Sequence, residues 1–288
     1  MSGDRGGVLQ IEYGYLPRHF EFLRDLAQRK AGIALAPSKQ DLVYGRVVRR
    51  IRALGLADFE AYCQLLEREP RRELGNFINA ITTNLTSFFR EIHHFDFLRD
   101  TLMPQWLAAR GAQPRVRIWS AGCSSGEEPY SIAITLQEAW GSQRTQACRV
   151  LATDIDTEVL GRASTALYDP ARLAPDQQAR LKRWSQPAPA PGTGLQLTAD
   201  IRRLVDFKPL NLIERWPAQD PFDLIFCRNV LIYFDKSTQR QLFERFAQAL
   251  APEGHLIVGH AETLHGMGTC FELVGRTIYR KVASAPSR

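Results

Sequence analysis

Long hydrophobic runs are absent from this sequence. No window approaches the roughly 18 consecutive apolar residues that a membrane span requires, and the first residues, MSGDRGGVLQIEY, lack the basic segment and apolar core of a secretory signal. Cysteine is scarce: the five cysteines lie far apart without a CxxC pair, which argues against a disulfide framework and against a zinc site. We therefore expect a cytoplasmic protein with no direct membrane insertion.

The composition is that of a globular protein with a small excess of positive charge. The chain has 288 residues, of which 44% are hydrophobic and 24% are charged, and this length suits two ordinary domains. The formal net charge of +6 favours an acidic partner, such as nucleic acid, anionic lipid or an acidic protein surface.

Two regions of the chain follow different patterns. Up to about Asn84 the apolar residues recur every three or four positions, which predicts helices over 17–31, 37–54, 57–69 and 71–83. Beyond a helix around 92–110, the apolar runs VRIWSAG, CRVLATD, FDLIFCRN and HLIVGH alternate with helical stretches, as in a parallel sheet with crossover helices.

These patterns predict a domain organisation. We expect a helical N-terminal domain at 1–90, a linking helix at 91–112 and an α/β domain at 113–288. The proline-rich SQPAPAPGTG, followed by the short apolar segments LQLTA and LVDFKP, predicts a small antiparallel ribbon inserted at about 185–209.

The segment WSAGCSSGEEPYS lies at the first bend from a predicted strand into a helix, where open α/β sheets bind their ligands. Gly122 and Gly126 allow the backbone to approach a ligand closely. Glu127 and Glu128 would repel a phosphate, so the bend favours a ligand with a positive group, such as an ammonium or a sulfonium. The alternative is an ordinary acidic helix start.

Asp154 ends the next predicted strand, CRVLATD. A carboxylate at this position can accept both hydroxyls of a ribose, as in dinucleotide sites. S-adenosylmethionine is a nucleoside derivative that carries a positive group and no phosphate, so it fits both observations. We interpret the nearby Asp156 as a helix cap rather than a ligand contact.

A third strand pattern, FDLIFCRNVLIYFD, ends in Arg228 and Asn229 and continues into an apolar turn that contains Tyr233. A polar pair at the end of a strand next to the first one would face the same crevice. The alternative is that the apolar turn is core and that Arg228 is a structural ion-pair partner.

Four segments, TTNLTSFFRE, IWSAGCSSGEEPYS, ATDIDTEVL and FCRNVLIYFD, resemble signatures of the CheR-type chemotaxis receptor methyltransferases, in the order of that family. The resemblance covers nearly the whole chain. It implies a small all-α N-terminal domain, a Rossmann-like, seven-stranded class I methyltransferase domain and a small antiparallel β subdomain. It also implies methyl transfer from S-adenosylmethionine to glutamate side chains of the chemoreceptor cytoplasmic helices in sensory adaptation, with S-adenosyl-L-homocysteine as product.

Carried over position by position, the resemblance implies a set of cofactor contacts. They are Asn84, Thr86, Arg90, Glu127, Asp154, Asn211, Leu212, Arg228 and Asn229. Of the two adjacent glutamates, Glu127 is assigned to the cofactor rather than Glu128. The guanidinium of Arg90 suits bidentate contact with the methionine carboxylate of the cofactor.

The expected chemistry requires no proton transfer, because a glutamate acceptor is already ionised near neutral pH. His93 and His94 are therefore given no catalytic role, and the six histidines show no ligand spacing, so we expect no metal. Tyr233 is a candidate for positioning the acceptor carboxylate or lining the methyl channel, with core packing as the alternative.

The helix predicted over 37–54 carries Lys39, Arg46, Arg49 and Arg50 on one face. With the resemblance, Arg46, Arg49 and Arg50 are expected to dock the acidic helices of a methyl-accepting chemoreceptor; the alternative is a solvated basic face. The glycine turn of family members that grip a receptor peptide is only partly matched by PGTGLQLTA, which leaves such a tether open.

Two other functions compete with this interpretation. A nucleic-acid methyltransferase would suit the positive charge, but the turn after Asn229 lacks the prolines of amino-methylating enzymes, and no aromatic and basic platform is present. We therefore expect no nucleic acid as partner. A binding module that holds the cofactor and signals without turnover is the second alternative, and transfer of labelled methyl separates it from the enzymes.

Overall fold

The computed structural model describes residues 12–189, 194–266 and 270–282. These residues form two compact units that divide between Thr82 and Thr83. The sequence analysis sets this division at residue 90 and treats 91–112 as a linker, whereas here residues 83–112 belong to the second unit. Within the described ranges, no helix combines the length and the apolar character needed to span a bilayer.

The first unit is helical, as predicted. Its helices are α1 (Pro17–Ala31), α2 (Gln40–Leu54), α3 (Phe59–Arg68) and α4 (Pro70–Ile81), with a 3-10 turn at Pro37–Lys39. Gly32 and Gly55 end the first two helices with φ angles of 71° and 64°, the left-handed conformation that glycine adopts without penalty. The apolar stripe of α2, formed by Val43, Val47 and Ile51, is fully buried.

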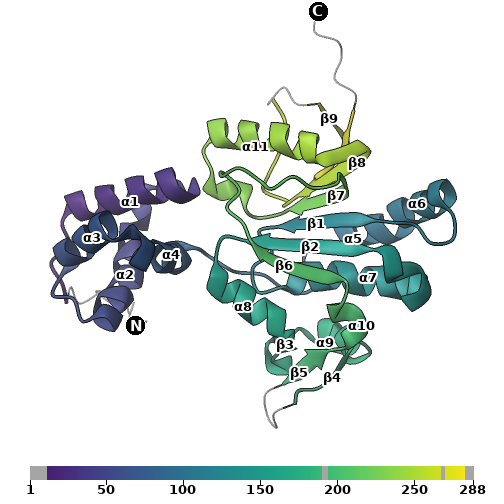
Figure 1. Ribbon diagram of the computed structural model, residues 1–288, viewed down its shortest axis with the longest axis horizontal. Coiled ribbons are helices and arrows are strands. Elements are labelled where there is room, and N and C mark those ends of the chain that lie inside the picture. Colours follow the sequence, from purple (N-terminus) through teal and green to yellow (C-terminus); the bar gives the residue numbers. More distant parts are fainter. Residues whose placement is uncertain (1–11, 190–193, 267–269, 283–288) are drawn as a thin grey trace, which may run out of the picture. The chain divides into compact units, whose positions relative to one another are not determined.

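The second unit is built on a sheet with the strand order β6-β2-β1-β7-β8-β10-β9 (Figure 1). The strands are β1 (Arg117–Ala121), β2 (Arg149–Asp154), β6 (Val205–Pro209), β7 (Phe222–Cys227), β8 (Leu250–Val258), β9 (Phe271–Gly275) and β10 (Ile278–Lys281). The first five in this order are parallel, and β10 is antiparallel to both its neighbours. Since β2 and β7 flank β1, the carboxyl end of β1 is the switch point at which such sheets bind ligands.

Helices cover both faces of this sheet, with α7 (Glu127–Arg144) on one side and α11 (Lys236–Ala249) on the other (Figure 1). Alternating side chains of β1 divide between the two apolar clusters: Ile118 packs in the cluster of α7, and Trp119 in the cluster of α11. The other helices are α5 (His93–Phe97), α6 (Met103–Arg110), α8 (Thr157–Thr165), α9 (Pro175–Lys182) and α10 (Ala199–Arg202).

A small antiparallel sheet has the order β3-β5-β4, with β3 at Leu167–Tyr168, β4 at Ser185–Pro187 and β5 at Leu195–Leu197. It differs from the ribbon predicted at about 185–209, because it recruits β3 and because 205–209 is instead β6, the edge strand beside β2. A half-buried edge strand and a ribbon strand show the same alternation in sequence, so the pattern of LVDFKP alone could not separate them. Part of the PGTG segment lies outside the described residues.

Candidate functional site

The bend between β1 and α7 is held against the end of β2. The backbone N–H groups of Gly122 and Cys123 both donate to the carbonyl oxygen of Thr153, at 2.8 and 2.9 Å. Gly122 has a φ of 86°, and a Cβ at this position would lie 2.3 Å from Cγ2 of Val230. The close approach of this bend to the turn after β7 therefore requires glycine.

Asp154 ends β2 with its carboxylate in the floor of the bend. Its Oδ2 accepts the N–H of Ser124 at 2.8 Å, and its Oδ1 accepts the N–H of Asp156 at 2.9 Å. Burial raises the pKa of the Asp154 carboxyl, and these two N–H donors partly offset that rise. Each oxygen retains a further lone pair, which suits two ribose hydroxyls.

Asp156 is the N-cap of α8, as predicted, and accepts two backbone N–H groups of the first turn. It also accepts a hydrogen bond of 2.7 Å from Nδ2 of Asn84, while Oγ of Ser124 donates to the carbonyl oxygen of Asn84 at 3.0 Å. The structure thus places Asn84 beside the end of β2, although the two segments lie far apart in the sequence.

The two adjacent glutamates of α7 face different groups. Glu128 is buried, with Oε1 accepting from Oγ of Ser120 at 2.7 Å and Oε2 lying 3.1 Å from Nη1 of Arg228. Glu127 accepts from Oγ of Ser125 at 2.7 Å. Burial raises the pKa of both carboxyls. Glu128 therefore pairs with Arg228 at the carboxyl ends of β1 and β7, and Glu127, the predicted cofactor contact, lies beside Ser125.

Arg228 is the buried cation at this edge, with 6% of its surface exposed. Beyond Glu128, its guanidinium lies 3.5 Å from Oε2 of Glu91 and donates to the carbonyl oxygen of Arg90. The ion-pair role that the sequence analysis left as an alternative is therefore present. Arg228 also connects the segment NLTSFFR to the end of β7.

Glu262, which the sequence analysis missed, organises the turn after β7. Its carboxylate is 5% exposed and accepts the N–H groups of Asn229 at 2.9 Å, Gly259 at 2.6 Å and Ile232 at 3.2 Å. Asn229 itself has a φ of 59°. Its position just after the predicted strand HLIVGH could have marked Glu262 as a site residue. The carboxyl ends of parallel strands meet at one edge of the sheet, so residues that follow them lie close together.

Arg90 and Tyr233 lie on the outer part of the same region. Nη1 of Arg90 donates to the carbonyl oxygen of Leu85 at 3.1 Å, and Oη of Tyr233 lies 3.5 Å from the carbonyl oxygen of Thr83. Tyr233 is half-buried, so it is not part of the core. Leu85 is 80% exposed, which leaves an apolar side chain at the surface beside these residues.

Asn211 and Leu212 follow β6 and reach the same edge through the backbone. The N–H of Leu210 donates to the carbonyl oxygen of Asp154 at 2.9 Å. Asn211 Oδ1 accepts the N–H of Ile213 at 3.2 Å, which fixes the start of the loop. The predicted residues of the PLNL segment therefore lie next to the end of β2.

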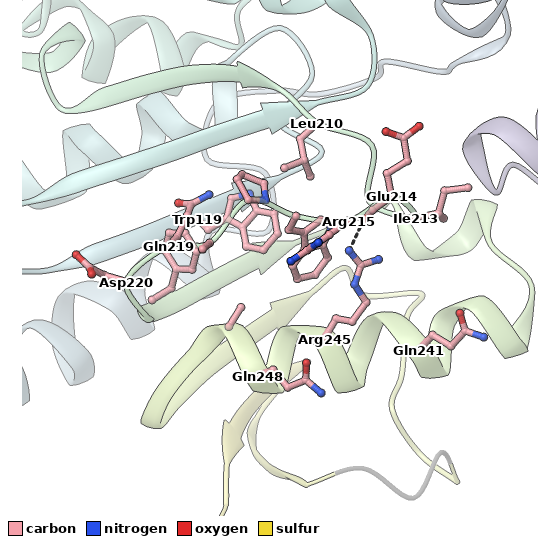
Figure 2. A pocket seen from close by; sticks show the side chains of 15 residues that line it. Trp119, Leu210, Ile213, Glu214, Arg215, Gln219, Asp220, Gln241, Arg245 and Gln248 are labelled. Atoms are coloured by element: carbon pink, nitrogen blue, oxygen red, sulfur yellow. Dashed lines mark hydrogen bonds between the residues drawn. The ribbon is translucent and has the colours of Figure 1, made fainter.

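A cavity of about 640 Å³ lies behind this loop, between α11 and the sheet (Figure 2). Arg245 extends from α11, stacks its guanidinium 4.0 Å from the ring centroid of Trp216 and donates to the carbonyl oxygen of Leu212 at 2.6 Å. Trp216 meets Trp119 edge to face at 4.8 Å. These contacts support the loop from the side opposite to the candidate site.

The three arginines of α2 that are predicted to dock the receptor, Arg46, Arg49 and Arg50, belong to the first unit. Nη1 of Arg46 donates to the carbonyl oxygens of Ile81 and Thr82 at 2.7 and 2.6 Å, and Arg50 forms a bidentate pair with Glu73 at 2.7 and 2.9 Å. Arg49 is exposed. Arg46 and Arg50 therefore fix α2 to α4, and Arg49 is the arginine of the three that faces solvent.

The charges at the carboxyl edge of the sheet suit a cationic ligand. Among the described residues, the buried carboxylates at this edge are those of Glu128, Asp154, Asp156 and Glu262, against the single buried guanidinium of Arg228. Burial raises the pKa of Glu128, Asp154 and Glu262, which means that ionising them without a compensating cation is costly. A nucleoside with a sulfonium and an ammonium would compensate that charge, so the residues fit S-adenosylmethionine.

Comparison with known proteins assigns both units to one family. Residues 18–82 match the family described as CheR methyltransferase, all-alpha domain, and residues 84–280 match CheR methyltransferase, SAM binding domain. The chain is 44% identical over 264 residues to the chemotaxis protein methyltransferase of Escherichia coli (strain K12), covering 91% of this chain and 90% of that protein.

Two other relatives show the same level of identity. The chemotaxis protein methyltransferase of Salmonella typhimurium (strain LT2) is 44% identical over 283 residues, covering 96% of both chains. Chemotaxis protein methyltransferase 2 of Pseudomonas aeruginosa (strain PAO1) is 44% identical over 272 residues, covering 93% of this chain and 94% of that protein. The chain therefore belongs to the CheR methyltransferase family and is an S-adenosylmethionine-dependent methyltransferase.

Proposed function

We propose that this enzyme transfers the methyl group of S-adenosylmethionine to glutamate side chains on the cytoplasmic helices of chemoreceptors, giving glutamate methyl esters. The observation that carries the cofactor part of this proposal is the excess of buried carboxylates over the buried guanidinium of Arg228 at the switch point of the sheet. The names of the relatives, chemotaxis protein methyltransferases, support the choice of substrate class.

The cofactor contacts follow from the placement of the residues. We assign Asp154 to the ribose hydroxyls, and Asn211 and Leu212 to the adjoining side of the nucleoside. Glu127 is assigned to the positive charge of the cofactor, because Glu128 is already compensated by Arg228 at 3.1 Å. Asn84, Thr86 and Arg90 complete the set with Arg228 and Asn229.

The chain supplies positioning rather than proton transfer. When bound, S-adenosylmethionine supplies an electrophilic methyl group on its sulfonium. A glutamate acceptor is ionised near neutral pH, so its oxygen forms the new C–O bond without a general base, and the electron pair of the broken C–S bond stays on sulfur. Tyr233 is proposed to orient the acceptor in line with the methyl group, an effect that is large by itself.

The helical unit is proposed to dock the receptor through α2, with Arg49 as the exposed member of the three predicted docking arginines. Replacing Arg49 by alanine should raise KM for receptor about two- to fivefold at low salt, the effect expected for one exposed charge. Raising the salt concentration should remove the difference. Arg172→Ala serves as the matched control, because Arg172 is an equally solvated arginine of the other unit, with 87% of its side chain exposed.

The decisive test combines cofactor binding with methyl transfer. Purified protein should bind S-adenosylhomocysteine in calorimetric titration, and Asp154→Ala should abolish this binding while the far-UV spectrum is retained. With methyl-labelled cofactor, receptor-containing membranes should acquire label that base releases as methanol. Cofactor binding without transfer to receptor would reject the proposed substrate, and base-stable label on nucleic acid would favour the competing function.

A further inference from the structure

Three side chains at the start of α5 converge on one point. Glu91, His93 and His94 each offer a ligand atom, and these atoms lie within 4.8 Å of one another. We propose that this cluster binds one divalent transition-metal ion of the zinc class. The proposal is independent of the methyl acceptor, because none of its ligands needs a role in substrate recognition.

The first observation is a set of buried polar atoms that lie close together and, in the described residues, accept or donate no hydrogen bond. Within the described part of the chain, Oε2 of Glu91, Nε2 of His93 and Nδ1 of His94 have no hydrogen-bond partner. His94 is fully buried, and its Nδ1 lies 3.6 Å from Oε2 of Glu91, beyond hydrogen-bond distance. Buried polar atoms are nearly always paired, so three in one cluster indicate a missing ligand.

The second observation is the direction of the hydrogen bonds around His94. Its Nε2 lies 3.3 Å from the carbonyl oxygen of Arg276, which can only accept a hydrogen bond, and 2.9 Å from Oγ1 of Thr277. Nε2 is therefore assigned as the donor, which in a neutral imidazole leaves a bare lone pair on Nδ1. This lone pair and the Glu91 carboxylate are two electron donors that point at each other, an arrangement that a cation satisfies.

The surrounding groups orient the ligands as outer-shell partners of metal sites do. Thr277 holds the ring of His94 through Nε2, and Nδ1 of His260 lies 3.0 Å from Oε1 of Glu91, which leaves Oε2 turned toward the histidines. Arg228 lies 3.5 Å from Oε2 of Glu91, but Glu128 at 3.1 Å offsets its charge.

The ligand set selects the class of ion. Two imidazoles and one carboxylate with an open position are typical of zinc and of neighbouring transition metals, whereas calcium and magnesium prefer oxygen ligands only. The spacing Glu-Ile-His-His is not a ligand spacing of a regular helix, so the sequence analysis expects no metal. The ligands converge because Glu91 precedes α5 in a left-handed conformation with a φ of 57°.

Zinc titration of the metal-free, full-length protein against a chromogenic chelator tests the proposal. We expect one zinc ion per chain, and X-ray absorption should show nitrogen and oxygen ligands without sulfur, which excludes binding by the five cysteines. His93→Ala should weaken zinc binding by about tenfold or more. His265→Ala is the matched control, because His265 is exposed and lies outside the cluster.

Two further measurements keep the outcome unambiguous. Thermal unfolding of the metal-free variants and their titration with S-adenosylhomocysteine show whether the fold and the cofactor site are intact. Glu91→Gln, which retains the size of the side chain, provides a second ligand variant and should also lose affinity for zinc. Folded protein that binds S-adenosylhomocysteine but not zinc would overturn the proposal, as would equal zinc affinity in His93→Ala and the wild type.

Discussion

Replacing Glu262 by glutamine tests whether this buried carboxylate fixes the turn that carries Asn229. The wild-type carboxylate accepts three backbone N–H groups, two on Oε2 and one, from Ile232, on Oε1. If the amide oxygen takes the place of Oε2, the amide nitrogen faces the N–H of Ile232, and two donors then oppose each other. One buried donor without an acceptor costs about 1–3 kcal/mol.

The Glu262→Gln protein should therefore lose about 1–3 kcal/mol of unfolding free energy in urea and bind S-adenosylhomocysteine more weakly. Glu262→Ala would orphan all three donors at a cost of about 3–9 kcal/mol, which approaches the whole stability of a typical protein. Glutamine is for this reason the informative substitution. Glu244→Gln is the matched control on the exposed face of α11 and should change stability by less than about 0.5 kcal/mol. Unchanged stability and unchanged affinity in Glu262→Gln would refute the reasoning.

Three further predictions concern the helical unit, the glycine bend and pH. Arg50→Ala should destabilise the protein by about 3 kcal/mol, because it leaves the carboxylate of Glu73, which is 1% exposed, without its cation. The double variant Arg50→Met, Glu73→Leu should recover most of that loss in urea unfolding; a single variant as stable as wild type would contradict this. Gly122→Ala should abolish S-adenosylhomocysteine binding in calorimetry, since its Cβ would meet Val230 at 2.3 Å, whereas Gly161→Ala, with nothing within 4 Å, should bind normally. Because burial raises the pKa of Glu127 above its ordinary value of 4.5, the ligand-free protein should lose stability as pH rises from 4.5 through the raised value. Binding of the cationic cofactor should then release protons and weaken as pH falls, which calorimetry in buffers of different ionisation enthalpy measures; binding without proton release at pH values just above 4.5 would contradict the assignment.

The local features of the fold and site follow from the sequence. The helical periodicity of α1 to α4 and the buried runs of β1, β2, β7 and β8 reflect burial patterns that depend only on residues a few positions apart. The cap at Asp156 is likewise a short-range feature, since it depends on backbone groups two and three positions away, whereas the need for glycine at position 122 comes from its long-range contact with Val230.

Features that depend on contacts between distant segments of the chain could not be predicted in the same way. Glu127 and Glu128 occupy the same first turn of α7, and which of them faces Arg228 depends on the rotation of the helix against β7. The hydrogen bonds of Glu262 depend on the adjacency of β7 and β8, because the residues it contacts lie on both strand ends. The bounds of β6 and the strands that make up the small sheet depend on which segments pair with one another. The alternation of apolar and polar residues does not specify these partners.

The charge at the carboxyl edge also bears on how the enzyme discriminates between its cofactor and its product. Among the described residues, four buried carboxylates and one buried guanidinium lie at this edge, so the edge retains a net negative charge when the carboxylates are ionised. S-adenosylmethionine carries a sulfonium charge that S-adenosylhomocysteine lacks, while their nucleoside and amino-acid parts are the same. The contacts proposed for Asp154 and Asn211 therefore cannot distinguish the two molecules, and the electrostatic field of the edge can. We therefore expect that loss of one positive charge on transfer weakens binding in this site of low dielectric and favours release of the product over the cofactor.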